Sequence, residues 1–167
     1  MKKNLFLLML LAITSAAYSQ KFGYVNTQEL LVSMPEVKAA DNELETYQKQ
    51  LLTIGQGKVA EFETEYKKYA EDAQKGILSQ VQIQAKEAEL AQKQEEIQKY
   101  EVEVQSQLAA KREELYKPIL DKVKMTIETY GKENGYTMIF DSSAGAILHA
   151  TETDNLINAL KAKLGVQ

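Results

Sequence analysis

The fold is decided by residues 35–118, which read PEVKAADNELETYQKQLLTIGQGKVAEFETEYKKYAEDAQKGILSQVQIQAKEAELAQKQEEIQKYEVEVQSQLAAKREELYKP. A proline stands at each end and none stands between, while Glu, Gln, Lys and Ala dominate both halves. These features predict two long antiparallel helices joined at residues 75–79, where Gly76 can take the left-handed conformation that ends a helix. Each helix would be ~60 Å long, too long for a single globule to enclose.

The apolar spacing of the first half predicts a coiled-coil seam that slips by one residue. Apolar or small residues recur in steps of three and four as far as Ile54, and the rhythm resumes one residue late. Gly55 and Gly57 lie at the slip, and each costs about 1 kcal/mol relative to alanine in a helix. We therefore expect local unwinding or a bend here, the alternative being two glycines tolerated on a helix surface. The resumed seam would consist of Val59, Phe62, Tyr66, Tyr69 and Ala73.

The second half predicts a narrower seam. Its apolar residues recur every seventh position, and the positions between them are mostly alanine or polar, so the distal arm should be slender. Ser79 and Gln82 have the spacing of a capping box that would start this helix. Pro118 removes one backbone hydrogen bond and is expected to kink the helix where the arm ends, as a third hinge beside the two glycines. The heptad residues are Ile83, Leu90, Ile97 and Val104.

Residues 20–34 and 119–167 are predicted to form a small body. Strands are expected at 21–26, 136–141 and 146–150, the last two as a hairpin, with a closing helix at 154–164. Three short strands with open edges are seldom stable alone, so pairing with the same strands of sister copies is expected. The predicted fold class is therefore mainly α, with a helical hairpin arm on a short-stranded body that assembles.

The first 19 residues are predicted to be a cleavable signal peptide. Lys2 and Lys3 precede an apolar run of 13 residues, and Ala17 and Ser19 are small residues at a cleavage site. The alternative is a membrane anchor, for which this run is too short. Cleavage would leave 18 of the 20 Lys and Arg against 24 Asp and Glu, a net charge of −6. An acidic chain gains little from nucleic acid, and zero cysteines exclude disulfides.

Three segments carry a resemblance to a known family. They are KFGYVNTQELLVSMPEVKAADNELE from Lys21, ELYKPILDKVKMTIETYGKENGYTMIFD from Glu114 and TETDNLINALKAKL from Thr151. Their order and spacing around the central hairpin resemble the Skp family of periplasmic chaperones, also called the OmpH family. The resemblance implies a homotrimer in the periplasm. It further implies that the trimer holds unfolded outer-membrane β-barrel proteins between its arms, without ATP.

One feature departs from that family, whose well-known members are basic with positively charged arm tips. Here the tip lysines Lys67, Lys68 and Lys75 compete with nearby carboxylates. Contact with an anionic membrane surface is therefore expected to be weakened.

No catalytic residue, cofactor or metal site is expected. His149 is the only histidine and has no cysteine or carboxylate cluster near it in sequence, which favours a structural role. Apolar residues off the predicted seam are the candidates for contact with a client protein, the alternative being scattered surface residues. A structural coiled-coil tether, or an assembly scaffold in the cell envelope, is the rival function. The client-contact candidates are Leu52, Ile77, Leu78, Tyr100 and Val102.

Overall fold

The computed structural model describes residues 20–166, so the predicted signal peptide lies outside the described residues. The chain divides into two compact units, one containing residues 20–34 and 122–166 and the other residues 35–121. The sequence placed the end of the arm at Pro118, whereas the second unit continues to Asp121. The mainly helical fold class is confirmed, with one small parallel sheet in the first unit.

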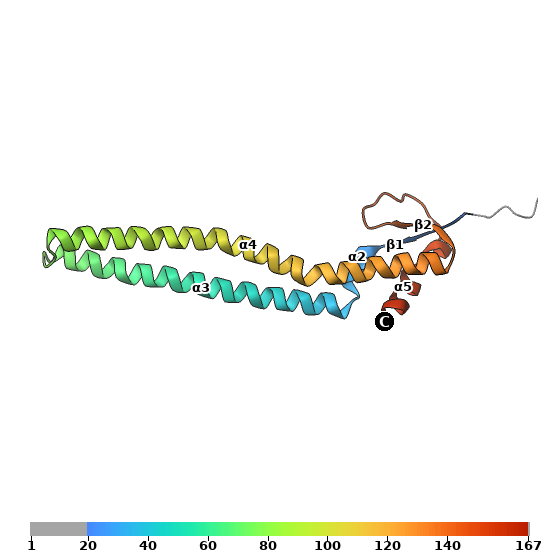
Figure 1. The fold of residues 1–167 in the computed structure, drawn as a ribbon, viewed down its shortest axis with the longest axis horizontal. Coiled ribbons are helices and arrows are strands. Elements are labelled where there is room, and N and C mark those ends of the chain that lie inside the picture. Colours follow the sequence, from blue (N-terminus) through green and yellow to red (C-terminus); the bar gives the residue numbers. More distant parts are fainter. Residues whose placement is uncertain (1–19, 167) are drawn as a thin grey trace, which may run out of the picture. The chain divides into compact units, whose positions relative to one another are not determined.

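The arm consists of α3, Pro35–Gln74, and the part of α4, Gln80–Glu133, that lies within residues 35–121. The two helices run antiparallel, side by side (Figure 1). The Tyr47 hydroxyl donates to Gln107 Oε1 at 2.8 Å, and nearer the tip the Tyr69 hydroxyl donates to Glu87 Oε1 at 2.8 Å. Partners therefore come closer in sequence toward the tip, as an antiparallel hairpin requires.

The tip forms as the sequence predicts. Gly76 has a φ of +68°, the left-handed conformation that side chains with a Cβ rarely adopt. The return helix starts with the expected capping box. The Ser79 amide donates to Gln82 Oε1 at 2.8 Å, and the Gln82 amide donates back to Ser79 Oγ at 3.4 Å.

The predicted unwinding at Gly55 and Gly57 is wrong, because α3 is continuous from Pro35 to Gln74. Glycine keeps its backbone amide, so its cost in a helix is about 1 kcal/mol and not a missing hydrogen bond. Pro118 likewise lies inside an unbroken α4. The proposed role of these three residues as hinges stays a prediction.

The predicted slip of the seam is correct for one row of residues and wrong for the other. Phe62 and Tyr69 of the predicted seam are half-buried, whereas Val59, Tyr66 and Ala73 are exposed. The second row instead continues the heptad of Leu51 through Lys58, Glu65 and Asp72. A continuous helix allows this, because 3.6 residues per turn let its inward face drift along successive heptads. Half the distal seam is consequently polar. The observed positions are Gly55, Lys58, Phe62, Glu65, Tyr69 and Asp72.

The return seam is confirmed. Leu90 is buried, and Ile83, Ile97 and Val104 are half-buried. These residues recur every two turns along the same side of α4, as a narrow heptad stripe requires.

The body contains a two-stranded parallel sheet of β1, Lys21–Val25, and β2, Tyr136–Asp141. Its core is built by α2, Thr27–Val32, and α5, Ile157–Leu164, which contact each other. A short 3-10 turn, η2, covers Glu152–Asp154, so the last α-helix begins later than the predicted 154. The most deeply buried side chains are Leu30, Met34, Leu160 and Val25.

The predicted strand at 146–150 is wrong for the single chain, since no strand is assigned there. Consequently β2 pairs with β1 and not with a following hairpin strand. A strand exists only where a neighbouring edge supplies backbone partners. Leu148, in the middle of this segment, is 96% exposed.

One face of the sheet carries large apolar side chains that nothing in residues 20–166 buries. Phe22, Met138 and Phe140 remain 42%, 54% and 46% exposed. The rings of Phe22 and Phe140 are 6.2 Å apart. A contiguous exposed apolar face of this kind is typical of an interaction surface.

Asp141 joins the end of β2 to the start of α2. Its Oδ2 accepts from the Thr27 hydroxyl at 2.6 Å, and its Oδ1 accepts from the amides of Thr27 and Ser143 at 3.2 and 2.9 Å. Partial burial pushes the pKa of the Asp141 carboxyl upward, but these hydrogen bonds outweigh burial, so the pKa lies below its usual value.

Asp141→Asn is therefore expected to lower the free energy of unfolding by about 1 kcal/mol at pH 6. Because the folded-state pKa is depressed, this stabilisation exists above the unfolded-state pKa and disappears as the pH falls through the folded-state value. Urea unfolding from pH 6 to pH 3 should show wild type and variant converging below about pH 4. A difference that stays constant over this range would contradict the ionic role of Asp141.

Candidate functional site

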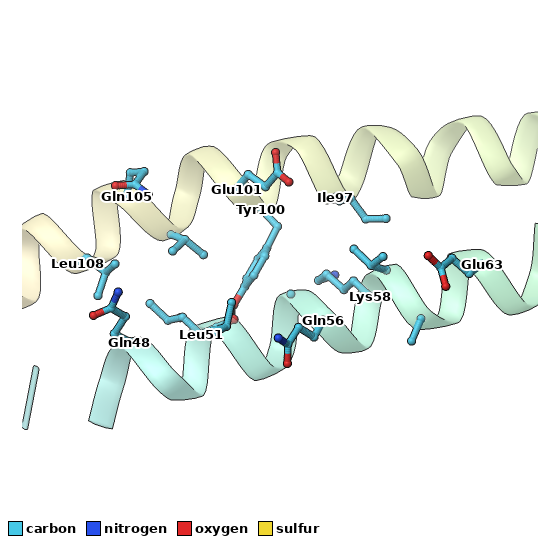
Figure 2. A pocket seen from close by; sticks show the side chains of 15 residues that line it. Gln48, Leu51, Gln56, Lys58, Glu63, Ile97, Tyr100, Glu101, Gln105 and Leu108 are labelled. Carbon is cyan, nitrogen blue, oxygen red and sulfur yellow. Dashed lines mark hydrogen bonds between the residues drawn. The ribbon is translucent and has the colours of Figure 1, made fainter. Parts of the chain in front are cut away.

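The arm contains an open groove of about 720 Å³ between α3 and α4. Its α3 wall follows one flank of that helix, from Gln48 through Leu52 to Glu63, and its α4 wall extends from Ile97 to Leu108. Figure 2 shows Ile97, Leu51 and Leu108 pointing into the space between the two helices. The apolar side chains of the walls are Leu52, Val59, Ile97, Val104 and Leu108.

Val59 lines the groove, although the sequence assigned it to the seam. In the continuous helix Val59 lies on the flank with Leu52, and these side chains are 39% and 59% exposed. Val59, which the sequence assigned to hairpin packing, therefore lines a surface feature together with the client-contact candidate Leu52.

Tyr100 forms the floor of the groove. Its side chain crosses from α4 to α3 (Figure 2), and its hydroxyl donates to the Leu51 carbonyl oxygen at 2.9 Å. Gly55 makes room for the ring, since a Cβ at Gly55 would lie 3.3 Å from Tyr100 Cε1. The Lys58 ammonium lies 5.7 Å from the centre of the ring, within reach of a cation–π attraction. Burial and the charge of Glu103 raise the pKa of the Tyr100 hydroxyl, so it remains a donor at neutral pH.

Polar groups at the rim are three amides, two carboxylates and the Lys58 ammonium. Gln48, Gln56 and Gln105 line the groove, together with the carboxylates of Glu63 and Glu101. Each amide offers both hydrogen-bond donors and an acceptor.

Distal to the groove, Lys93 bridges two carboxylates of α3. Its ammonium donates to Glu61 Oε1 at 2.6 Å and to Glu65 Oε1 at 2.9 Å. These hydrogen bonds, first that to Glu61, raise the pKa of Lys93 above its usual value. The second oxygen of Glu65 is buried and has no hydrogen-bond partner. Charged groups thus occupy seam positions that a dry coiled coil would fill with apolar residues.

The structure brings together two of the five client-contact candidates. Leu52 and Tyr100 both line the groove, whereas Val102 lies outside its lining and is 74% exposed. Tyr100, which the sequence placed off the seam, nevertheless has partners in the hairpin, because it contacts Gly55 and Leu51. Ile77 and Leu78 lie in the tip turn, where Ile77 is exposed and Leu78 half-buried. The client-contact role of all five stays a prediction.

The tip lysines are exposed on the surface of the arm, and Lys75 lies 3.8 Å from Glu71. Lys67 and Lys68 belong to the same last turns of α3. Nearby carboxylates such as Glu71 partly neutralise the positive charge of these lysines. Their contribution to membrane contact stays a prediction.

Sequence reasoning missed Val59, Val104 and Leu108 as groove residues. Val59 and Val104 were assigned to the heptad seam, and heptad position alone does not distinguish the inner side of a helix from its flank. The available signal was Gly55, because a glycine opposite a tyrosine in an antiparallel register makes room for the ring.

Among residues 20–166, no helix combines the length and apolar content that crossing a membrane requires. Over the same range, His, Asp and Glu side chains form no group of three or more that could hold a metal ion.

Gly55, which lines the groove, and Gly57, which does not, allow a matched test of the Tyr100 contact. Gly57→Ala is expected to raise the free energy of unfolding by about 1 kcal/mol, because a Cβ there meets nothing within 4 Å. Gly55→Ala should give little or no gain, because the Tyr100 ring must move and its hydrogen bond to Leu51 weakens. Urea unfolding followed by far-UV circular dichroism measures both variants. An equal gain in the free energy of unfolding for both variants would show that the Tyr100 contact does not require a glycine at position 55.

A long antiparallel helical arm and a small α/β body define the class of protein, and comparison with known proteins defines the family. Residues 21–164 match the family model described as outer membrane protein (OmpH-like). The chain belongs to this family. No curated protein matches the sequence.

A solved structure supports the same fold. It is a candidate outer membrane chaperone (OmpH-like) from Caulobacter crescentus CB15, 18% identical, with a TM-score of 0.75. The similarity covers 90% of this chain and 87% of that one.

Proposed function

We propose that this protein is an ATP-independent holdase chaperone of the periplasm, which binds unfolded outer-membrane β-barrel proteins. The observation that carries the proposal is the open apolar groove on the arm, with its amide rim. Membership of the OmpH-like family supports a chaperone role, as does the similarity to a candidate outer membrane chaperone. A holdase needs exposed apolar surface that remains accessible to many clients, and this groove provides such a surface.

The active form in this proposal is a homotrimer. The exposed sheet face of Phe22, Met138 and Phe140 would be covered by sister copies, and residues 146–150 would pair as a strand only in the assembly. Three arms would then enclose the client. The proposal divides the chain into three parts. These are a cleavable signal peptide over 1–19, a body that assembles, and a client-binding arm over 35–118. Neither a catalytic role nor a cofactor is part of the proposal.

The rival function is a structural tether or an assembly scaffold. A tether is best served by a continuous dry seam, whereas half-buried Lys58 and Glu65 interrupt the seam of this arm. The polar seam and the groove therefore favour a surface that takes up other chains over a rod that only spans a distance.

Light scattering distinguishes these functions. An outer-membrane β-barrel protein unfolded in urea is diluted into buffer with increasing amounts of the purified protein, without nucleotide. A holdase should suppress aggregation and saturate near three chains per client, with ATP having no effect. An unrelated acidic protein of similar mass serves as the control. Unchanged aggregation at a large excess would contradict the proposal and leave the tether.

A further inference from the structure

We propose that the arm groove binds an extended segment of about five to seven residues in which apolar and polar side chains alternate. The proposal rests on the holdase function and names the part of an unfolded client that the groove takes. It follows from the length of the groove, the chemistry of its walls and the chemistry of its rim.

The length of the groove sets the length of the segment. On α3 the lining extends from Gln48 to Glu63, and on α4 from Ile97 to Leu108. At about 1.5 Å per residue these stretches measure roughly 22 Å and 16 Å. An extended chain advances about 3.3 Å per residue, so about five to seven residues fit.

The walls set the pattern of side chains. Leu52 and Val59 face the groove from α3, and Ile97, Val104 and Leu108 face it from α4, above the floor of Leu51 and Tyr100. The opposite side of a bound segment would face solvent, since the groove is open. Successive side chains of an extended chain point to opposite sides. A segment that is apolar on one side and polar on the other therefore fits best.

The rim favours an extended backbone over a helix. The amides of Gln48, Gln56 and Gln105 can pair with backbone N–H and C=O groups, which an extended segment leaves without partners. A helix satisfies these groups internally. Among the charged lining residues, Glu63 and Glu101 outnumber Lys58, which disfavours acidic side chains in the segment.

A tryptophan-bearing peptide tests the proposal directly, because the protein contains no tryptophan. The probe is a capped nine-residue peptide in which Leu, Val and one Trp alternate with Thr and Lys. The control peptide has the same composition, rearranged so that its apolar residues lie three and four positions apart, which places them on one side of a helix. Titration of the full-length mature protein should give a saturable blue shift of the emission of the alternating peptide. Binding of the rearranged peptide should be at least tenfold weaker.

Two charge-matched double variants locate the site. Leu52→Glu with Val59→Glu places two carboxylates on the groove wall, whereas Ile54→Glu with Val81→Glu places two at exposed positions of the arm outside the lining. All four side chains are exposed, so both variants should keep the far-UV circular dichroism of wild type. The groove variant should bind the alternating peptide at least tenfold more weakly than wild type, and the control within twofold.

The outcomes separate this inference from the function on which it rests. Equal binding of both peptides, or equal loss in both variants, would overturn the groove assignment. Tighter binding of the rearranged peptide would mean that a helix docks there instead. If wild type and the groove variant suppress client aggregation equally, the holdase function stands and the groove assignment fails. If wild type suppresses no aggregation, the proposed function itself fails.

Discussion

Replacing Met138 and Phe140 with glutamate should convert a three-chain assembly into single chains. Both side chains are about half exposed on one face of the two-stranded sheet, which the proposed trimer would bury. A carboxylate transferred into such an interface costs several kcal/mol if it finds no partner. Each copy would carry two, so dissociation at micromolar concentration should be complete. Sedimentation equilibrium or light scattering coupled to size exclusion measures the change in mass.

The client-holding activity should fall with the mass, because a single arm cannot enclose an unfolded protein. The control is Ile54→Glu with Val81→Glu, which adds the same charge to the arm unit and should leave three chains together. A Met138→Glu, Phe140→Glu protein that retains its three-chain mass would show that the sheet face is not the contact between copies.

Leu30→Ala should destabilise the body by about 3 kcal/mol, the second large effect. Leu30 and Leu160 are completely buried, and they belong to the two helices that form the core of the body. Truncation removes transfer free energy and leaves a cavity that a small core cannot fill by collapse. The matched control is Val32→Ala in the same helix, where the side chain is 76% exposed and the expected loss is below about 0.5 kcal/mol.

Urea unfolding at one fixed chain concentration is the measurement, since assembly makes apparent stability depend on concentration. Similar losses in the free energy of unfolding for the two variants would mean that Leu30 does not belong to a packed core. A loss confined to Leu30→Ala would support the core of α2 and α5.

The features that the sequence predicted well are local. The tip needed only a glycine able to adopt positive φ and a Ser–Gln pair at the capping distance, and both are present as expected. The β1 and β2 segments were recognisable from alternation and from their flanking turn residues. Such signals depend on neighbours in sequence, so one chain suffices to read them.

The features that the sequence predicted poorly depend on partners. Apolar spacing suggested that Val59 faced α4, but Val59 lies on the flank and lines the groove. The same spacing could not reveal that Lys93 would satisfy Glu61 and Glu65 across the hairpin. The strand pattern at 146–150 forms no strand in a single chain, where Leu148 is exposed and Ile147 is half-buried.

Native mass spectrometry of the mature protein with an unfolded outer-membrane β-barrel protein tests the central claim most directly. The account predicts three copies of the chain alone, and three copies with one client after dilution of the client from urea. Single copies under both conditions, with no client bound, would contradict it.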